Sequence, residues 1–212
     1  MTQYPKINTI WKRNPKTHKI IEGEWAMAEF GYLQYNAWEL TEKIDGTNIR
    51  VMWDGSQISF GGKTDNAEIP TFLDEKLHSI FSPLNATFHE VFANSNEVCL
   101  YGEGYGDRIQ KYGHQYIANG VDFILFDVKI GKWWLGRDSI ESIADKLGIK
   151  CVPLLDVASL SYAIALAEKG FQSRIGSREA EGIVAKSLPG LLTRGGERII
   201  AKIKHSDFGG EK

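Results

Sequence analysis

Residues 38–46 read Trp-Glu-Leu-Thr-Glu-Lys-Ile-Asp-Gly, and this stretch decides how the rest of the sequence is interpreted. Its first part has the residue types of a strand, and the Asp45-Gly46 pair is typical of a turn. Lys43 therefore lies at the end of a predicted strand, where a fold can present one amine to a phosphate. The pattern Lys43-Ile44-Asp45-Gly46 is weak when taken alone, so its meaning depends on the segments that follow it.

Composition places the chain among soluble globular proteins. It has 212 residues, 42% hydrophobic and 25% charged, which is enough to bury one sizeable core. The formal net charge is -2, so any nucleic-acid binding has to use a local basic patch. The apolar runs are too short for a membrane span, and the N-terminus lacks the apolar region of a signal peptide. We expect a cytoplasmic protein without membrane contact, with Cys99 and Cys151 as buried free thiols.

Predicted strands outnumber predicted helices. Turn residues predict hairpins around residues 14–17, 54–55 and 131–132, the first of them a basic hairpin or extended arm. Apolar spacings of three and four predict helical structure in residues 70–93. Two more helices are expected to end at Gly148 and Gly170, with Asp138 as a cap of the former. The pattern predicts an α+β fold with a largely antiparallel sheet, in a single domain over residues 1–212.

Two later segments place acids and aromatic rings near strand ends. Glu103 lies in a glycine-rich turn, Tyr-Gly-Glu-Gly-Tyr-Gly. Phe123 and Phe126 lie on one predicted strand, three positions apart, so they face opposite sides of a sheet. One ring is therefore expected in the core, and the other is free to contact a ligand.

Two further segments place charges on strand faces. In the run Glu181 to Lys186, alternation predicts that Glu181 shares a face with Ile183, while Lys186 lies on the other face. Lys202 and Lys204 share one face of the last strand, where two ammonium groups repel each other unless an anion lies between them.

Taken in order, these five segments resemble the signature motifs of the covalent nucleotidyltransferase superfamily, which includes polynucleotide ligases and capping enzymes. The resemblance covers about residues 38–208, and Thr47-Asn48 together with residues 205–208 look most like the phage-type RNA ligase 2 family. It implies a nucleotidyltransferase (ATP-grasp-like ligase) domain of antiparallel sheets with flanking helices. Only eight residues follow Lys204, so we expect no OB-fold or other C-terminal domain. The chain is then either a minimal ligase or a truncated one.

The resemblance implies an ATP-dependent RNA ligase that joins 5′-phosphate and 3′-hydroxyl ends. Lys43 would attack the α-phosphorus of ATP and carry AMP, which then passes to the RNA 5′-phosphate. An ordinary lysine is protonated at neutral pH, and the charges of Lys202 and Lys204 would favour its neutral form and hold the α-phosphate. The alternatives are a DNA ligase, an mRNA guanylyltransferase, or a module that binds RNA ends or nucleotide without sealing.

The same resemblance implies roles for the other site residues. Glu103 would bond the ribose hydroxyls, and Glu181 would bind Mg²⁺ directly or through water. Phe126 would stack on adenine, with Phe123 as the competing choice. The predicted nucleotide contacts as a set are Glu42, Asp45, Gly46, Asn48, Glu103, Phe126, Lys186, Lys202 and Lys204. The alternative is a solvated strand acid for each glutamate, and a surface lysine for Lys186.

RNA contact is predicted at Lys63, Arg108 and Lys111. Lys63 lies twenty residues after the nucleophile, where phage-type ligases carry an arginine, and a lysine supplies charge without a bidentate fork. Lys12 and Arg13 are alternative contacts, and a solvated charge is an equal alternative for each of these cations. We expect a monomer that acts on nicked duplex RNA in RNA repair, in the host cytoplasm if the protein is encoded by a bacteriophage.

Overall fold

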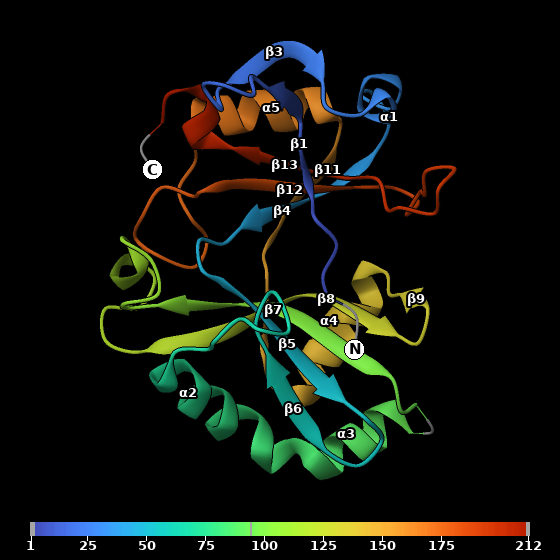
Figure 1. Cartoon of the computed structure of the whole chain (residues 1–212), viewed down its shortest axis with the longest axis vertical. Coiled ribbons are helices and arrows are strands. Elements are labelled where there is room, and N and C mark those ends of the chain that lie inside the picture. The colour runs from blue at the N-terminus through green and yellow to red at the C-terminus, as the bar shows by residue number, and fades with distance from the viewer. Residues whose placement is uncertain (1–2, 94, 211–212) are drawn as a thin grey trace. The chain divides into compact units, whose positions relative to one another are not determined.

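The computed structural model describes residues 3–93 and 95–210, which form two compact units (Figure 1). Unit 1 comprises residues 3–5 and 45–152, and unit 2 comprises residues 6–44 and 153–210. The chain passes between the units after residues 5, 44 and 152. Each unit is a mainly antiparallel sheet with helices, so the predicted α+β class is confirmed. A single nucleotidyltransferase domain over residues 1–212 stays a prediction.

The sheet of unit 1 has six strands in the order β10-β8-β7-β5-β6, with β9 paired to β8. The strands are β5 (Thr47–Trp53), β6 (Ile58–Gly61), β7 (Val98–Gly106), β8 (Val121–Ile130), β9 (Trp133–Trp134) and β10 (Lys150–Cys151). Every pair is antiparallel except β10 with β8. The turns at Asp54-Gly55 and Gly131 join β5 to β6 and β8 to β9, which confirms two of the predicted hairpins.

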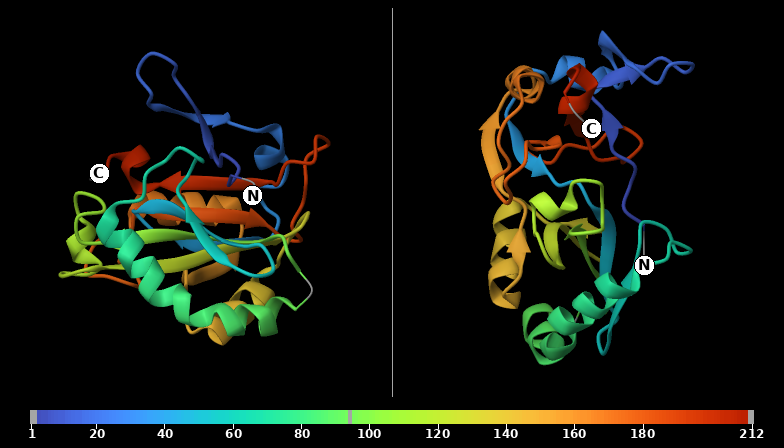
Figure 2. Two further views of the ribbon diagram at one scale, coloured as in Figure 1. Left: turned by 60° about the horizontal axis from the view of Figure 1, so that its bottom comes forward. Right: turned by 90° about the vertical axis from the view of Figure 1, so that its left-hand side faces the viewer.

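Three helices of unit 1 pack on one face of this sheet: α2 (Thr71–Phe81), α3 (Asn85–Phe92) and α4 (Arg137–Leu147), joined by the short helix η1 (Ser82–Leu84). A further short helix, η2 (Gly113–Gln115), follows β7. In both views of Figure 2, α2 and α3 run along the same side of the sheet. Leu73 and Phe81 of α2 share one core with Val51, Leu100 and Phe123 of the strands. Since strand side chains alternate, the opposite face is the one that presents polar residues.

The helix ends follow the expected residue types with one exception. Helix α4 begins after Gly136, so Asp138 lies in its first turn, where it favours the helix N-terminus by charge but does not cap it. Gly148 ends α4 with a φ of 65°, a conformation that glycine adopts without strain. In unit 2, α5 (Leu160–Lys169) begins at Ser159, whose hydroxyl accepts a hydrogen bond from the Tyr162 N–H, and it ends at Gly170.

The sheet of unit 2 has five strands in the order β1-β13-β12-β4-β11. They are β1 (Asn8–Thr9), β4 (Trp38–Lys43), β11 (Leu154–Ala158), β12 (Gly182–Ser187) and β13 (Ile200–Lys204). Only β1 and β13 run parallel. Strands β2 (Trp11–Arg13) and β3 (Ile20–Trp25) form the predicted N-terminal hairpin. The helices are α1 (Ala28–Tyr32), α5 and η3 (His205–Phe208).

Alternation along these strands separates an apolar face from a polar one. The apolar residues that pack with α1 and α5 are Trp38, Leu40, Ile183, Ala185, Ala201 and Ile203. The intervening residues form what we call the polar face of unit 2: Glu39, Thr41, Lys43, Val184, Lys186, Lys202 and Lys204. The side chain of Lys43 therefore leaves the sheet on the side away from the helices. None of the described helices is long and apolar enough to cross a membrane.

Candidate active site

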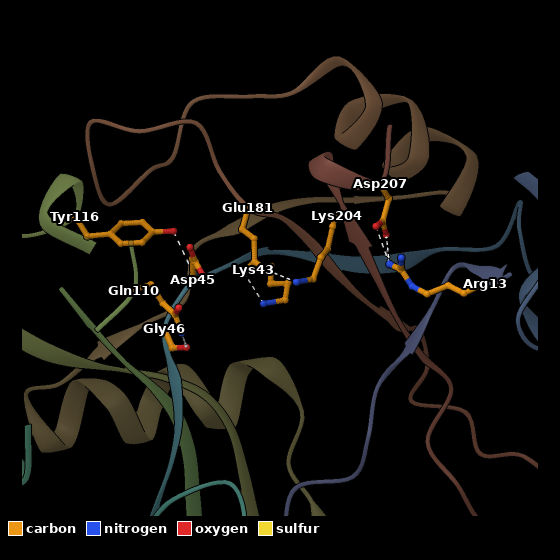
Figure 3. A network of polar contacts seen from close by, with 9 residues as sticks. All are labelled: Arg13, Lys43, Asp45, Gly46, Gln110, Tyr116, Glu181, Lys204 and Asp207. Atoms are coloured by element: carbon orange, nitrogen blue, oxygen red, sulfur yellow. Dashed lines mark hydrogen bonds and ion pairs between the residues drawn. The ribbon is translucent and has the colours of Figure 1, made fainter. Parts of the chain in front are cut away.

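The centre of the candidate site is an ion cluster at the end of β4. The Lys43 Nζ lies 2.5 Å from Glu181 Oε2, and the Lys204 Nζ lies 2.6 Å from Glu181 Oε1 (Figure 3). The Glu181 side chain is 13% exposed, against 22% for Lys43 and 32% for Lys204. The tertiary structure thus brings together the first, fourth and fifth of the segments that the sequence singled out.

The Glu181 carboxyl group is held in its ionised form. Burial by itself would raise its pKa, but the charges and hydrogen bonds of Lys43 and Lys204 lower the pKa below its ordinary value. Less water screens these two ion pairs than would screen an exposed pair, but burial of the charges costs desolvation energy that offsets the gain. An ionised carboxylate therefore lies directly beside Lys43.

Gly182 explains how one carboxylate reaches both lysines. The strand register places Gly182 between Lys43 on β4 and Lys204 on β13. Its φ of 152° and the nearby Ile203 carbonyl exclude a Cβ atom, so only glycine fits. Glu181 precedes the strand, and its carboxylate reaches the polar face. The prediction that Glu181 shares a face with Ile183 was therefore wrong, because strict alternation does not extend through this glycine.

In unit 1, backbone contacts fix the turn that follows Lys43. The Asp45 N–H donates to the Tyr116 hydroxyl at 3.2 Å, and the Gly46 carbonyl accepts from Gln110 Nε2 at 2.9 Å (Figure 3). A Cβ on Gly46 would collide with the Gly104 carbonyl. The glycine of the Lys-x-Asp-Gly pattern is thus explained by a turn that lies against β7.

The polar face of unit 1 carries Glu103 and Asn48, which are direct cross-strand partners on β7 and β5. The Asn48 Oδ1 is buried and accepts no hydrogen bond within the described part of the chain. A buried carbonyl oxygen of this kind is costly unless a donor reaches it. Asn48 and Glu103 thus lie side by side on this face, and their contact with a nucleotide stays a prediction.

Arg50 lies on the same face and was not singled out from the sequence. It is 2% exposed, and its guanidinium donates to the Gly62 carbonyl and to Asp65 Oδ1, both at 2.8 Å. These bonds hold the loop that carries Lys63, which is exposed. The position of Arg50 could have been predicted from the sequence, because alternation along the strand places it on the same face as Asn48 and opposite to Ile49.

Phe123 and Phe126 face opposite sides of the unit 1 sheet, as expected. Phe123 is 1% exposed, and its ring centroid lies 5.3 Å from that of Phe81 in the core. The register shifts along β8 so that Phe126 has no direct partner on β7. Its ring is partly exposed on the polar face. The prediction that Phe123 is a core residue is confirmed, and adenine stacking on Phe126 stays a prediction.

Tyr4 is a second residue that sequence reasoning missed. Its hydroxyl donates to Asp127 Oδ2 at 2.8 Å, and Asp127 is fully buried. Its ring lies 5.1 Å from the rings of both Tyr101 and Phe126 and 5.5 Å from that of Trp134. Tyr4 therefore supports the segment that carries Phe126. Nothing in the local pattern around residue 4 marks it, because its partners lie about a hundred or more positions away.

Glu42 lies on the core side of β4 and is 1% exposed. Its carboxylate accepts from the Ser173 hydroxyl at 2.5 Å and from the Arg174 N–H at 2.8 Å. Burial raises its pKa, although these two hydrogen bonds oppose the change. This geometry favours a role in holding residues 173–174 beside β4 over the direct nucleotide contact predicted for Glu42.

The cations proposed as RNA contacts differ in their surroundings. Arg108 lies 4.5 Å from the ring of Phe72, and Lys111 lies 4.7 Å from that of Tyr112, both in unit 1. In unit 2, Arg13 donates to both Asp207 oxygens at 2.7 Å (Figure 3). Lys12, also in unit 2, pairs with Glu24 at 3.5 Å. The guanidinium of Arg13 is thus engaged by a carboxylate, which weakens its case as an alternative contact. Lys186 lies opposite Glu39, one strand away.

The family model for RNA ligases matches residues 36–204, and the chain belongs to the RNA ligase family. Solved structures of a Naegleria gruberi RNA ligase share the fold. The structure with PPi is 21% identical, with a TM-score of 0.65 over 95% of this chain and 61% of that one. An apo variant is 21% identical, with a TM-score of 0.64 over 97% of this chain and 58% of that one.

A further variant of the Naegleria gruberi ligase, with ATP and Mn, is 23% identical, with a TM-score of 0.61 over 84% of this chain and 52% of that one. At such identities the likeness shows the fold alone. This chain spans little more than half the length of these structures. No curated protein matches it.

Proposed function

We propose that this chain is an ATP-dependent RNA ligase that joins 5′-phosphate and 3′-hydroxyl ends through AMP carried on Lys43. The observation that carries the proposal is the Lys43–Glu181–Lys204 cluster in a chain of the RNA ligase family. Support for ATP comes from the Naegleria gruberi ligase of the same fold, whose structures hold ATP or AMP with Mn.

The proposed chemistry has three balanced steps. The Lys43 Nζ loses a proton and forms a bond to the α-phosphorus of ATP, while the bond to the β-phosphate oxygen breaks and pyrophosphate leaves. An oxygen of the RNA 5′-phosphate then attacks the same phosphorus and breaks the N–P bond. Finally, the RNA 3′-hydroxyl attacks the 5′-phosphate and AMP leaves. Each step exchanges one bond to phosphorus for another, so the residues mainly supply charge and position.

The first step requires that Lys43 become neutral. Its contact with the Glu181 carboxylate stabilises the ammonium form, which cannot attack phosphorus. Lys204 acts in the opposite direction, since a second cation beside Lys43 disfavours the charged form and Lys204 competes for the same carboxylate. We therefore propose that Glu181 holds Lys43 inactive in the free chain and releases it when a cation takes over the carboxylate.

A divalent metal fits this arrangement. Within residues 3–93 and 95–210 no group of three His, Cys, Asp or Glu side chains could hold a metal ion. Magnesium does not need one, because it binds through one or two carboxylates and completes its shell with water and phosphate oxygens. Glu181 is the residue that would hold it, and the ion would neutralise phosphate charge and draw the carboxylate away from Lys43.

The remaining residues take the following proposed roles. Glu103 and Asn48 bind the ribose or a phosphate, and Phe126 stacks on the base. Lys202 and Lys204 hold the α-phosphate from the polar face of unit 2. The RNA contacts are Lys63, Arg108 and Lys111, on a monomer that works in the cytoplasm on nicked duplex RNA.

A DNA ligase or an mRNA guanylyltransferase would use similar chemistry, but the family model that matches is that of RNA ligases. A module that binds RNA ends or nucleotide without sealing would take up no covalent AMP, and this separates it from a ligase.

Intact mass measurement after incubation with ATP and Mg²⁺ tests the proposal. The wild-type chain should gain the mass of one AMP, and Lys43→Ala should gain none while remaining folded. Lys169→Ala, an exposed lysine at the end of α5, is the matched control and should label like wild type. Label on the Lys43→Ala variant would show that Lys43 is not the nucleophile.

A further inference from the structure

The turn of the β2–β3 hairpin carries positive charge that the proposed chemistry does not use. Residues 12–19 contain four lysine or arginine side chains and no acid, in a chain whose formal net charge is -2. All four of these residues are exposed. The next acids along the chain, Glu22 and Glu24, lie in β3. The turn is therefore a local basic patch, of the kind that attracts an anionic partner to a chain without a basic field of its own.

The four cations of the hairpin divide into two that are paired and two that are not. Arg13 is held by the Asp207 carboxylate, and Lys12 pairs with an acid of β3 at 3.5 Å. No acid in the described part of the chain pairs with Lys16 or Lys19. In both views of Figure 2 the turn that carries these two lysines stands clear of the rest of unit 2. Lys16 and Lys19 thus offer two ammonium groups to an external anion.

Hydrogen bonds hold the backbone of this turn in one conformation. The Asn14 side-chain oxygen accepts from the N–H groups of Lys16 and Thr17 at 2.9 and 3.1 Å. The His18 N–H donates to the Asn14 carbonyl at 2.8 Å, and the Arg13 guanidinium donates to the His18 carbonyl at 2.7 Å. His18 has a φ of 57°, which is uncommon for a residue with a side chain and persists where the surroundings fix it. Because the turn is already ordered, binding a partner costs it little conformational entropy.

The base of the hairpin is fixed to the segment that carries the lysines of the candidate site. Strand β1, just before the hairpin, pairs with β13 and places Thr9 opposite Lys202. Arg13 binds Asp207 in η3, which directly follows β13 (Figure 3). All of these residues belong to unit 2, as does Lys43. A polynucleotide held at the turn would therefore be held by the same unit that presents the proposed nucleophile.

The side chains of the turn favour a sugar-phosphate backbone over other anionic partners. Lysine ammonium groups are compact point charges that neutralise phosphates without reading a base. Thr17 and His18 are exposed between them and can form hydrogen bonds with phosphate or ribose oxygens. Residues 14–19 include no large apolar side chain that could enter a lipid bilayer. In a chain of the RNA ligase family, the partner that fits these properties is RNA.

We propose that Lys16 and Lys19 bind the phosphate backbone of RNA, as a contact separate from the ion cluster at Lys43. This inference rests on the proposed function for its RNA substrate, but it does not depend on the transfer of AMP. The hairpin would bind RNA of any sequence, because its contacts are to phosphates. It would add a contact from unit 2 to those proposed for Lys63, Arg108 and Lys111.

The test measures binding of a fluorescein-labelled nicked RNA duplex by anisotropy, without ATP, over a range of salt concentrations. Each lysine that binds a phosphate adds about 1 to the slope of log affinity against log salt concentration. Lys16→Ala/Lys19→Ala should therefore lower the slope by about 2, and should weaken binding equally on two duplexes of unrelated sequence. Lys16→Arg/Lys19→Arg should restore binding. Lys146→Ala/Lys169→Ala, which removes exposed lysines from α4 and α5, is the matched control and should bind like wild type.

An unchanged slope in the folded Lys16→Ala/Lys19→Ala variant would overturn the inference. An equal fall in the control pair would also overturn it, because the loss would then reflect net charge alone. Tighter binding to phosphatidylserine vesicles than to RNA, with the same dependence on Lys16 and Lys19, would identify a membrane as the partner and overturn it as well.

AMP uptake by the wild-type chain, followed by intact mass, separates this inference from the proposed function. If wild type takes no label but RNA binding still depends on Lys16 and Lys19, the ligase proposal fails and the RNA contact stands. If Lys43 is labelled and the two lysines leave RNA binding unchanged, the hairpin contact fails and the adenylylation chemistry stands.

Discussion

Lys43 and Lys204 bind the two oxygens of one carboxylate, that of Glu181, from strands β4 and β13. The two ammonium groups come from segments about 160 residues apart in the sequence, and in the sheet only Gly182 separates them. Like charges this close are stable because an anion lies between them. If a phosphate replaces that anion, the two lysines can take their proposed roles. Lys43 would attack the phosphorus, and Lys204 would hold the phosphate.

Alanine at Lys202 or Lys204 should slow self-adenylylation. Each lysine would stabilise charge on the α-phosphate in the transition state, and loss of such a contact costs about 2.7–4 kcal/mol. Lys204→Ala should be the more severe change, because Glu181 is then left with Lys43 as its ammonium partner in this cluster. Single-turnover AMP transfer from ATP measures the rates, with Lys169→Ala as control. Rates within a factor of about two of wild type in both variants would contradict the assignment.

Phe126→Ala should weaken ATP binding by about 1–3 kcal/mol, the range for a base on an aromatic ring. Phe123→Ala should instead lower the free energy of unfolding by about 3–5 kcal/mol, since it leaves a cavity in the core of unit 1. Calorimetric titration with ATP and denaturant unfolding separate the two effects. The reverse pattern would show that the ring on the polar face has no part in nucleotide binding.

Tyr4→Phe should destabilise the chain while keeping the aromatic contacts. The substitution removes a donor from the buried Asp127 carboxylate, at a cost of about 1–3 kcal/mol in the free energy of unfolding. ATP affinity should also fall, because Asp127 and Phe126 are adjacent. Tyr32→Phe, at an 88% exposed ring, should change neither quantity. If Tyr4→Phe is as stable as wild type, this hydrogen bond contributes nothing to the free energy of unfolding.

Glu42→Gln should change how stability depends on pH. Burial raises the folded-state pKa of Glu42 above its unfolded value, so the folded state holds the proton more tightly. Stability is therefore lost in the wild type as the pH rises from the unfolded towards the folded pKa. The melting temperature of wild type minus that of Glu42→Gln should fall as the pH rises above about 4, the ordinary pKa of glutamate. A difference that is flat or rises with pH would exclude the raised pKa.

Sealing should be much faster on a pre-annealed RNA nick than on free single strands. The proposed contacts, Lys63, Arg108 and Lys111, can reach few phosphates, so RNA binding should be weak and sensitive to salt. In a nick the duplex itself brings the two ends together. Joining of both substrates is compared at equal concentration and low salt, with Lys146→Ala as an exposed-lysine control. Equal or faster joining of single strands would contradict the proposed preference for nicked duplex RNA. The proposed adenylylation of Lys43 would be unaffected.

Several features of the fold could be predicted because they depend on neighbours in the sequence. The Asp54-Gly55 turn, the glycine ends of α4 and α5 and the alternation along β12 and β13 are local patterns, and the structure confirms them. The position of Lys43 at a strand end followed from the same reasoning. These patterns, in order, were also sufficient to place the chain among nucleotidyltransferases.

Only the tertiary structure decided which side chains meet. The contact of Glu181 with Lys43 requires the pairing of β4 with β12. A positive φ at Gly182 breaks the side-chain alternation from which the face of Glu181 was predicted. The Tyr4 hydroxyl donates to Asp127, which lies 123 positions further along the chain. The physical reason is that hydrogen-bond patterns within a turn or strand are local, whereas register and burial arise from contacts between segments far apart in the chain.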